Sequence, residues 1–363
     1  TQYLRSNPKE LFSDIPEGYG GTIDPNASTN TTFGRIFIDQ EAKKIFKFTR
    51  QGLSEISNLG VRSFLKNNLD IKLLKHFPDY PYSDENFIGY KIGYDNRFNR
   101  LLITKIDYEP KNPETLEPYG QFFRDVETKV LADFNDESYF FNRSFTLSYD
   151  PVEQTWISFH SYYPQGYVWD RDHLYSFQEG GLWRHGSKYG EHQMFYDEYH
   201  EHIVETILKD KTGLESSNTD IIIDFEAEQY LGADWVKGKK KSFNGMLLYN
   251  ANQSTGNISL NPKDKANQLS NMQRKEGEAT IDYVKGFARI NEVRDRVVDE
   301  DTPIFTGDLK DGRKLVNEQN IGSSNQPLEG KYLVVRLHLN DESQTNLQHI
   351  TKRVISDTTI TSR

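Results

Sequence analysis

Histidines are concentrated in one part of the sequence, and their spacing raises the question of a metal site. His200 and His202 flank Glu201, and on a β-strand this spacing puts both imidazoles on one face. The alternative is that these histidines are half-buried partners of the many Tyr and Trp around them. No HExxH motif is present, because Val204 stands where the second histidine would fall. We therefore predict no metal ligands among the six histidines of this part, His160, His173, His185, His192, His200 and His202.

Closely spaced carboxylates are the second group with potential chemistry, because a general acid and its base must face each other across a cleft. Acids in turns are usually solvated, however, and nothing in the sequence places these acids across a cleft. We predict no catalytic residue among them. The pairs are Asp170 with Asp172 and Asp220 with Asp224, and one acidic run contains Asp299, Glu300 and Asp301.

Several enzyme classes are excluded by what the sequence lacks. The chain contains no cysteine, which excludes disulfides, thiolate metal sites and cysteine nucleophiles. It also contains no G-x-S-x-G motif, no phosphate-binding P-loop and no G-x-G-x-x-G after a strand. The sequence thus predicts a protein that is not an enzyme and that holds no cofactor.

The charge balance bears on the partners of the chain. There are 44 Lys and Arg against 54 Asp and Glu, a formal net charge of −10, and so acidic a chain is a poor candidate for a nucleic-acid binder. The run of Lys237, Lys239, Lys240 and Lys241 is interpreted as a solvated turn, with contact to an acidic partner or a nucleic acid as the alternative. No run of 18 apolar residues is present, so no membrane span is predicted.

The segments that position these side chains are mainly β-hairpins. Aromatic residues make up 13% of the chain, which favours β-structure. In three hairpins an aspartate ends an apolar strand, and six residues later an apolar residue opens the return strand. Consecutive aspartates are 56 and 55 residues apart, which is typical of propeller-like repeats, although aspartate is common in turns and chance spacing is the alternative. The pairs are Asp39 with Ile45, Asp95 with Leu101, and Asp150 with Trp156.

The pattern predicts a mainly β chain with few helices and three parts. The first part shows no sustained periodicity of apolar residues. The second contains the propeller-like antiparallel hairpin repeats and a helical insertion, which Asn67 and Asn68 can interrupt. The third is a second β-rich, sandwich-like domain. A strand at 331–340 in the third part has one Leu/Val face that must be buried. The predicted parts are the irregular N-terminal arm 1–32, the hairpin repeats 33–190 with helix near 60–77, and the second domain 191–363 with an extended polar excursion near 254–279.

One hairpin tip resembles a known motif. The run SYDPVEQTW at 148–156 approximates the Asp-box of sialidases and related propellers, S-x-D-x-G-x-T-W. Ser148, Asp150, Thr155 and Trp156 match in kind, but one residue is inserted and the glycine is absent. The resemblance implies a device that stabilises the tip of a hairpin and implies no catalytic role.

Longer segments resemble a family of phage proteins. GRIFIDQEAKKIFKFTRQGLSEISNLGVRSFLKNN, YDNRFNRLLITK, FTLSYDPVEQTWISFHSYYPQGYVWDRDHLYSFQEGGLWRH and KYLVVRLHLN are similar to the tail structural proteins, of the muzzle type, of crAss-like and related Bacteroidetes phages. The resemblance implies a virion component of the tail, present in several symmetric copies, with no enzymatic residues. Because the chain starts at Thr1 and is shorter than these proteins, the resemblance implies the C-terminal portion of a longer protein.

Two functions are consistent with these observations. The first is a structural protein of the virion tail that contacts other copies of itself and other tail proteins and gates the tail end. The second is a glycan-binding or glycan-cleaving propeller module that recognises the host surface, since aromatic side chains can stack on sugars. Its candidate residues are Tyr162, Tyr163, Tyr167 and Trp169, for which packing between blades is the alternative role.

Overall fold

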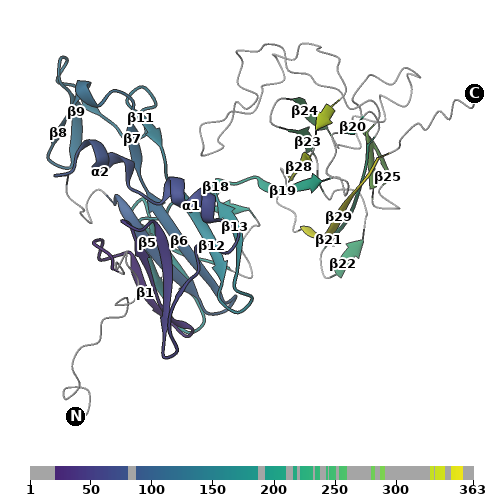
Figure 1. Ribbon diagram of the computed structural model, residues 1–363, viewed down its shortest axis with the longest axis horizontal. Coiled ribbons are helices and arrows are strands. Elements are labelled where there is room, and N and C mark those ends of the chain that lie inside the picture. The colour runs from purple at the N-terminus through teal and green to yellow at the C-terminus, as the bar shows by residue number, and fades with distance from the viewer. Residues whose placement is uncertain are drawn as a thin grey trace, which may run out of the picture. The chain divides into compact units, whose positions relative to one another are not determined.

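The computed structural model describes residues 21–80, 87–186 and 193–209, followed by the strands named below and the single residues 243, 250 and 253. The chain divides into two compact units, Thr1–Gly190 and Glu191–Arg363. Almost every described element is a strand, and every strand pair is antiparallel (Figure 1). This confirms the prediction of a mainly β chain with few helices.

The first sheet of unit 1 is a four-stranded meander. Its first strand lies within the segment that was predicted to be an irregular arm, so that prediction is wrong for these four residues. The reason is that Thr29 and Thr31 are β-branched and that residues 28–31 find a partner strand directly after a tight turn. Residues 1–20 of the predicted arm lie outside the described residues. The strands are β1 (Ser28–Thr31), β2 (Gly34–Asp39), β3 (Lys44–Thr49) and β4 (Gly52–Glu55).

The second sheet joins two of the repeated hairpins. Strand β6 pairs directly with β12, although a long segment separates them in the sequence. The hairpins that begin at Asp95 and Asp150 therefore share one sheet, and the 55-residue spacing does not mark a separate blade for each. No closed ring of blades occurs in the described part of the chain, and the propeller stays a prediction. The strands are β5 (Gly89–Asp95), β6 (Arg100–Ile106), β12 (Phe145–Asp150) and β13 (Thr155–His160).

A third sheet packs on β5 and contains the predicted fourth hairpin. Its strands are β14 (Gly166–Trp169), β15 (Leu174–Gln178) and β16 (Gly181–Arg184). The ring of Tyr167 occupies the space where a side chain at Gly93 would stand, because a Cβ there would lie 2.6 Å from the Tyr167 Cγ. The Tyr167 hydroxyl is 2.7 Å from the Oγ1 of Thr104. One side chain thus links the two sheets.

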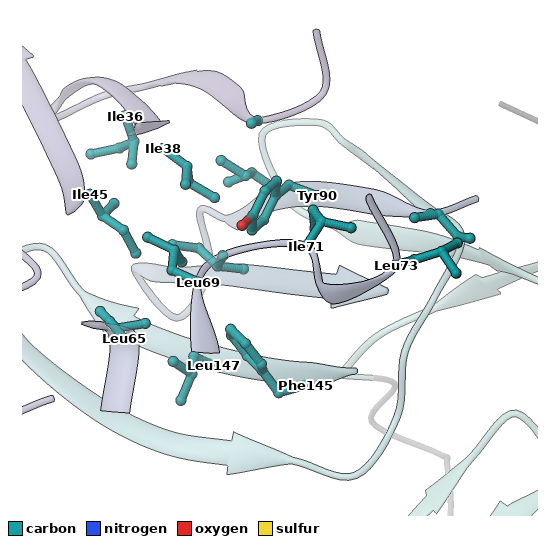
Figure 2. Packing of buried hydrophobic residues seen from close by; sticks show 14 of the residues in the cluster. Ile36, Ile38, Ile45, Leu65, Leu69, Ile71, Leu73, Tyr90, Phe145 and Leu147 are labelled. Atoms are coloured by element: carbon teal, nitrogen blue, oxygen red, sulfur yellow. The ribbon is translucent and has the colours of Figure 1, made fainter. Parts of the chain in front are cut away.

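The predicted helix at 60–77 consists of two short helices, α1 (Arg62–Asn68) and α2 (Lys72–His76). The break comes directly after Asn68, as the sequence allowed. The side-chain amide of Asn68 donates to the carbonyl of Phe64, 2.9 Å away, so it competes with continuation of the helix. Leu65, Leu69 and Leu73 from this segment enter the main core with Ile36, Ile38 and Ile45 of the first sheet and with Tyr90, Phe145 and Leu147 of the second (Figure 2).

Residues 108–142 form an insertion between β6 and β12, which we call the insertion. It contains two small sheets that lie beside α2 (Figure 1). One sheet consists of β7 and β11, and the other of β8, β9 and β10. The elements are β7 (Tyr108–Pro110), the 3₁₀ turn η2 (Pro113–Thr115), β8 (Leu116–Tyr119), β9 (Phe122–Asp125), β10 (Leu131–Ala132) and β11 (Phe140–Asn142).

The described part of unit 2 contains one four-stranded sheet, one larger sheet and two strand pairs. The four-stranded sheet has the order β19-β28-β23-β24, with β19 (His202–Lys209), β28 (Tyr332–Leu339), β23 (Gly245–Tyr249) and β24 (Ser254–Ser259). The larger sheet contains β21 (Ile221–Leu231), β22 (Asp234–Lys237), β25 (Ala279–Asp282), β26 (Phe287–Ile290) and β29 (Thr345–Val354). The pairs are β17 (Met194–Phe195) with β18 (Glu198–Tyr199), and β20 (Ser216–Asn218) with β27 (Leu328–Gly330).

The structure tests two predictions about unit 2. Strand β28 buries Leu333, Val335, Leu337 and Leu339, which confirms the predicted Leu/Val face. The polar excursion near 254–279 is wrong for its first six residues, because β24 pairs with β23 and the Thr255 hydroxyl lies 3.1 Å from the backbone nitrogen of Leu248. Residues 260–278 lie outside the described residues. Among the described helices of the chain, none has the length and apolar character that a membrane span requires.

Candidate assembly surface

The three repeated hairpin tips share one turn geometry. In each, the carboxylate of the aspartate accepts backbone N–H groups two or three residues further on, and the fourth residue after the aspartate has a positive φ. Such a turn closes a four-residue loop by purely local contacts. The N–H donors are Ala42 to Asp39 (2.9 Å), Arg97 to Asp95 (3.0 Å) and Val152 to Asp150 (2.7 Å), and the residues of positive φ are Lys43, Asn99 and Gln154.

A fourth tip of this kind lies in the insertion and was missed. Asp125 accepts the N–H of Thr128 at 2.7 Å, and Lys129 has a φ of 56°. These backbone bonds hold the pKa of Asp125 below its usual range. The tip at 148–156 is also stabilised, as the Asp-box resemblance implied, since Trp156 donates from its indole Nε1 to the carbonyl of Ile56, the residue after β4, at 3.1 Å.

A buried lysine fixes the point where the insertion leaves the second sheet. Lys105 is 0% exposed, and its ammonium lies 2.6 Å from the Oδ2 of Asp107. It also donates to the backbone carbonyls of Asn68 (2.8 Å) and Asp70 (2.7 Å) in the segment between the helices. Burial lowers the pKa of Lys105, and the charge of Asp107 opposes this shift. Three acceptors for three N–H groups satisfy a charged ammonium.

Asp107 connects that lysine to α2 and to the end of the insertion. Its two carboxylate oxygens accept the N–H groups of Lys72 (2.8 Å) and Leu73 (3.1 Å). Its backbone carbonyl accepts the N–H of Arg143 at 2.9 Å, and its own N–H lies 3.1 Å from the Oγ of Ser144. The chain therefore leaves the sheet at Asp107 and returns beside the same residue, so the base of the insertion is closed.

Aromatic side chains of the insertion extend the main core. Phe123 is fully buried, and its ring centroid lies 4.7 Å from that of Phe77 and 4.9 Å from that of Tyr80. Phe134 and Phe140 complete the cluster at 5.8 Å each. The inner face of β8, β9 and β10 is thus anchored on the segment that follows α2.

The opposite face of β8, β9 and β10, which we call the outer face, exposes large apolar side chains. The register places Tyr119 opposite Phe122, and Leu131 opposite Arg124, so all four side chains lie on one face. Tyr119, Phe122 and Leu131 are 53%, 49% and 55% exposed. Exposed aromatic and leucine side chains that cluster on one sheet face are typical of a protein interface.

Charged groups on the outer face are held in fixed positions. The Nε of Arg124 lies 2.6 Å from the Oε1 of Glu117, and the Nζ of Lys129 lies 2.9 Å from the same oxygen. These two hydrogen bonds, that of Lys129 first, hold the pKa of Glu117 below its usual range. The Arg124 guanidinium also stacks over the ring of Tyr119, with 4.6 Å between its Cζ and the ring centroid. A tyrosine and an arginine in one fixed pair are side chains that commonly carry binding energy.

The histidines predicted not to be ligands lie against aromatic rings in most cases. His200 packs on Phe195 (5.6 Å between centroids), His202 on Phe243 (6.4 Å) and His160 on Tyr162 (5.1 Å). Burial lowers the pKa of His200 and of His202. No group of three metal-ligating side chains occurs among the described residues, and His192 lies outside them.

His185 and Ser176 form a pair whose residue types occur in hydrolases. The Oγ of Ser176 lies 2.7 Å from the Nε2 of His185, and burial lowers the pKa of His185 to about 4. Ser176 is 0% exposed on the inner face of β15, so its oxygen cannot reach a substrate. The pair is part of the packing between sheets.

The predicted sugar-stacking residues mostly face inward. Tyr167 packs on Gly93, Tyr162 is 6% exposed, and Trp169 packs against the main core. Tyr163 is partly exposed. Packing accounts for the positions of Tyr162, Tyr167 and Trp169, and glycan binding stays a prediction.

The predicted acidic pairs fall into two groups. The carboxylate of Asp170 accepts the N–H groups of Asp172 (2.8 Å) and His173 (2.7 Å), and these bonds lower its pKa. It therefore closes the turn between β14 and β15. Asp220, residues 299–301 and the lysines at 239–241 lie outside the described residues, and the side chains of Asp224 and Lys237 are likewise not described.

A mainly β chain with a sheet face on which several large apolar side chains are exposed together is typical of proteins that act by assembly. Residues 15–180 match the family described as Crassvirus muzzle protein. The match confirms the resemblance to muzzle-type proteins of crAss-like phages, and with it a place in the virion tail. It covers the insertion and the three repeated hairpins, and it ends before unit 2. No curated protein matches the sequence.

Proposed function

We propose that this chain is a structural subunit of the tail end, which acts through contacts with other copies of itself and with other tail proteins and contributes to gating. The outer face of the insertion carries this proposal. It brings three exposed apolar side chains together around an arginine that Glu117 and Tyr119 already hold in place.

Contacts within the outer face order its side chains before a partner binds. Burial of apolar surface contributes about 25 cal/mol per Å². Ordering a long side chain at an interface costs about 0.5–1.5 kcal/mol. Because Arg124 is held between Glu117 and Tyr119, its side chain loses less conformational entropy when a partner binds. Beneath the sheet, Phe123 packs on Phe77 and Tyr80.

The test is a paired substitution on this face in phage particles. The variant Phe122→Asp/Leu131→Asp puts two charges where a partner would bury apolar side chains. The matched control is Leu182→Asp on β16, a residue that is 62% exposed in the same unit. Virions grown with each variant are analysed by quantitative mass spectrometry, and the thermal unfolding of each purified chain is measured first to establish folding.

We expect the paired variant to fold and its amount in virions to fall at least tenfold, with the control at the wild-type level. Incorporation of the paired variant at the wild-type level would contradict the role of the outer face. Binding of host capsular polysaccharide by the purified chain, abolished by substitution of Tyr163, would favour the glycan-binding alternative.

A further inference from the structure

Strand β19 is an edge strand with exposed isoleucines. Among the strands that the structure describes, β19 pairs with β28 alone and ends the sheet. Its side chains alternate between exposed and half-buried along 201–208. Ile203 and Ile207 are 44% and 58% exposed on the outward side. An edge strand with apolar side chains is a template for another strand.

Two of the usual features that prevent edge pairing, a proline and a bulge, do not occur in β19. The strand contains no proline, and its register with β28 runs without a bulge from His202 to Lys209. The single charged residue between Ile203 and Ile207 is Glu205, and its Oε2 lies 2.8 Å from the Nε of Arg336 on β28. The charge of Glu205 is therefore compensated within its own sheet.

The sequence of β19 is complementary to itself when it is read in the opposite direction. If two copies pair antiparallel with Glu205 opposite Glu205, each Ile203 stands opposite the other Ile207. The same register places Glu201 opposite position 209, where the sequence has a lysine. Each of the two central glutamates keeps the ion pair with Arg336 of its own copy, so the order across the dimer is Arg336, Glu205, Glu205, Arg336. The isoleucine pairs and the Glu201–Lys209 pair are of kinds that stabilise neighbouring strands, whereas the central Glu205 pair is a like-charge pair whose repulsion the two arginines offset.

We propose that β19 pairs with β19 of a second copy of this chain, antiparallel and with Glu205 on the two-fold axis. The resulting contact is isologous, and it continues the four-stranded sheet of unit 2 into a sheet of eight strands across two copies. This inference deepens the proposed function, because it rests on assembly with other copies. It uses a different surface in a different unit, however, so the two can fail separately.

The absence of cysteine allows a direct test by disulfide formation. In the full chain carrying Ile203→Cys and Ile207→Cys, the proposed register brings each cysteine opposite one of the partner. Opposite Cα atoms in antiparallel strands are about 4.5–5.5 Å apart, which a disulfide spans. Within one strand the two positions are about 13 Å apart, which excludes an internal disulfide.

We expect the double variant to form a covalent dimer under mild oxidation, seen on a non-reducing gel and lost with reductant. Each single variant should remain monomeric on the gel, because Ile203 is not opposite itself. An equimolar mixture of the two single variants should give the mixed dimer. Failure of the double variant to cross-link, or equal cross-linking of the single variants, would overturn the proposed pairing.

A second measurement does not depend on cysteine. Sedimentation of the unmodified chain should show a concentration-dependent dimer. The variant Ile203→Lys/Ile207→Lys should weaken this dimer at least tenfold while its thermal unfolding stays unchanged, since both side chains face solvent in the single chain. The outer-face variant Phe122→Asp/Leu131→Asp should dimerise normally. A Lys variant that dimerises as the wild type does would contradict the proposal.

Discussion

Replacement of Lys105 by methionine tests the buried ion pair at the base of the insertion. The substitution keeps a side chain of similar length and removes the ammonium. It leaves Asp107 without its closest cation, and it leaves the carbonyls of Asn68 and Asp70 without the donors at 2.8 and 2.7 Å. Breaking a buried pair by removal of one partner costs about 3–5 kcal/mol. Because the carboxylate keeps two backbone N–H donors and methionine packs well, we expect about 3 kcal/mol of destabilisation.

Tryptophan fluorescence in a urea titration measures this loss. Three of the four tryptophans, Trp156, Trp169 and Trp183, lie in unit 1 and report on its unfolding. The control Lys66→Met removes an exposed lysine from α1 and should change the unfolding free energy by less than about 0.5 kcal/mol. A Lys105→Met chain as stable as the control would refute the argument. In that case the ion pair would have cost as much in desolvation as it returned.

Two further predictions concern local features of unit 1. Gln154→Gly should raise the unfolding free energy by about 0.5–1 kcal/mol in the same urea titration, because Gln154 has a φ of 54°. Asn99→Gly at the equivalent position should raise it by less, since asparagine tolerates this conformation. Equal increases in the two variants would contradict this reasoning. Burial raises the pKa of Asp70, but hydrogen bonds from Lys75 and Lys72 outweigh this effect and hold the pKa at about 2. The stability that Asp70 contributes is therefore present above pH 4 and is lost as the pH falls towards 2. After screening by solvent this amounts to roughly 1 kcal/mol, and Asp70→Asn should flatten the change of melting temperature with pH in that window; an unchanged slope would show that other carboxylates dominate.

The sequence predicted the features of this fold that depend on local chemistry. The turns at Asp39, Asp95 and Asp150 were found because a carboxylate that accepts nearby N–H groups needs only residues within the turn. The Leu/Val face of β28 was found because its residues recur at every second position along the strand itself, although Val334 and Arg336 on the other face are buried as well. The missed turn at Asp125 follows the same chemistry and the same spacing, since Leu131 stands six residues after it, but its return strand β10 has only two residues.

The features that depend on distant partners were not predictable in this way. The equal spacing of the aspartates suggested separate blades, but the direct pairing of β6 with β12 places two hairpins in one sheet. Nothing local to either strand encodes that pairing. Lys105 lies on the same face of its strand as Leu101 and Ile103, and this was the one sign in the sequence that it is buried. Its burial depends on carbonyl groups more than thirty residues earlier in the sequence.

Asp107 is the residue that joins the core to the candidate surface. One carboxylate binds Lys105 and the first N–H groups of α2, while the backbone of the same residue closes the insertion on Arg143 and Ser144. The position of β8, β9 and β10 is therefore fixed at its base by this network and beneath by the packing of Phe123 on Phe77 and Tyr80. A surface held in place before binding loses less conformational entropy when a partner docks. We infer that the polar groups of this buried charge pair fix one direction for the insertion, which an apolar contact of the same volume would not do.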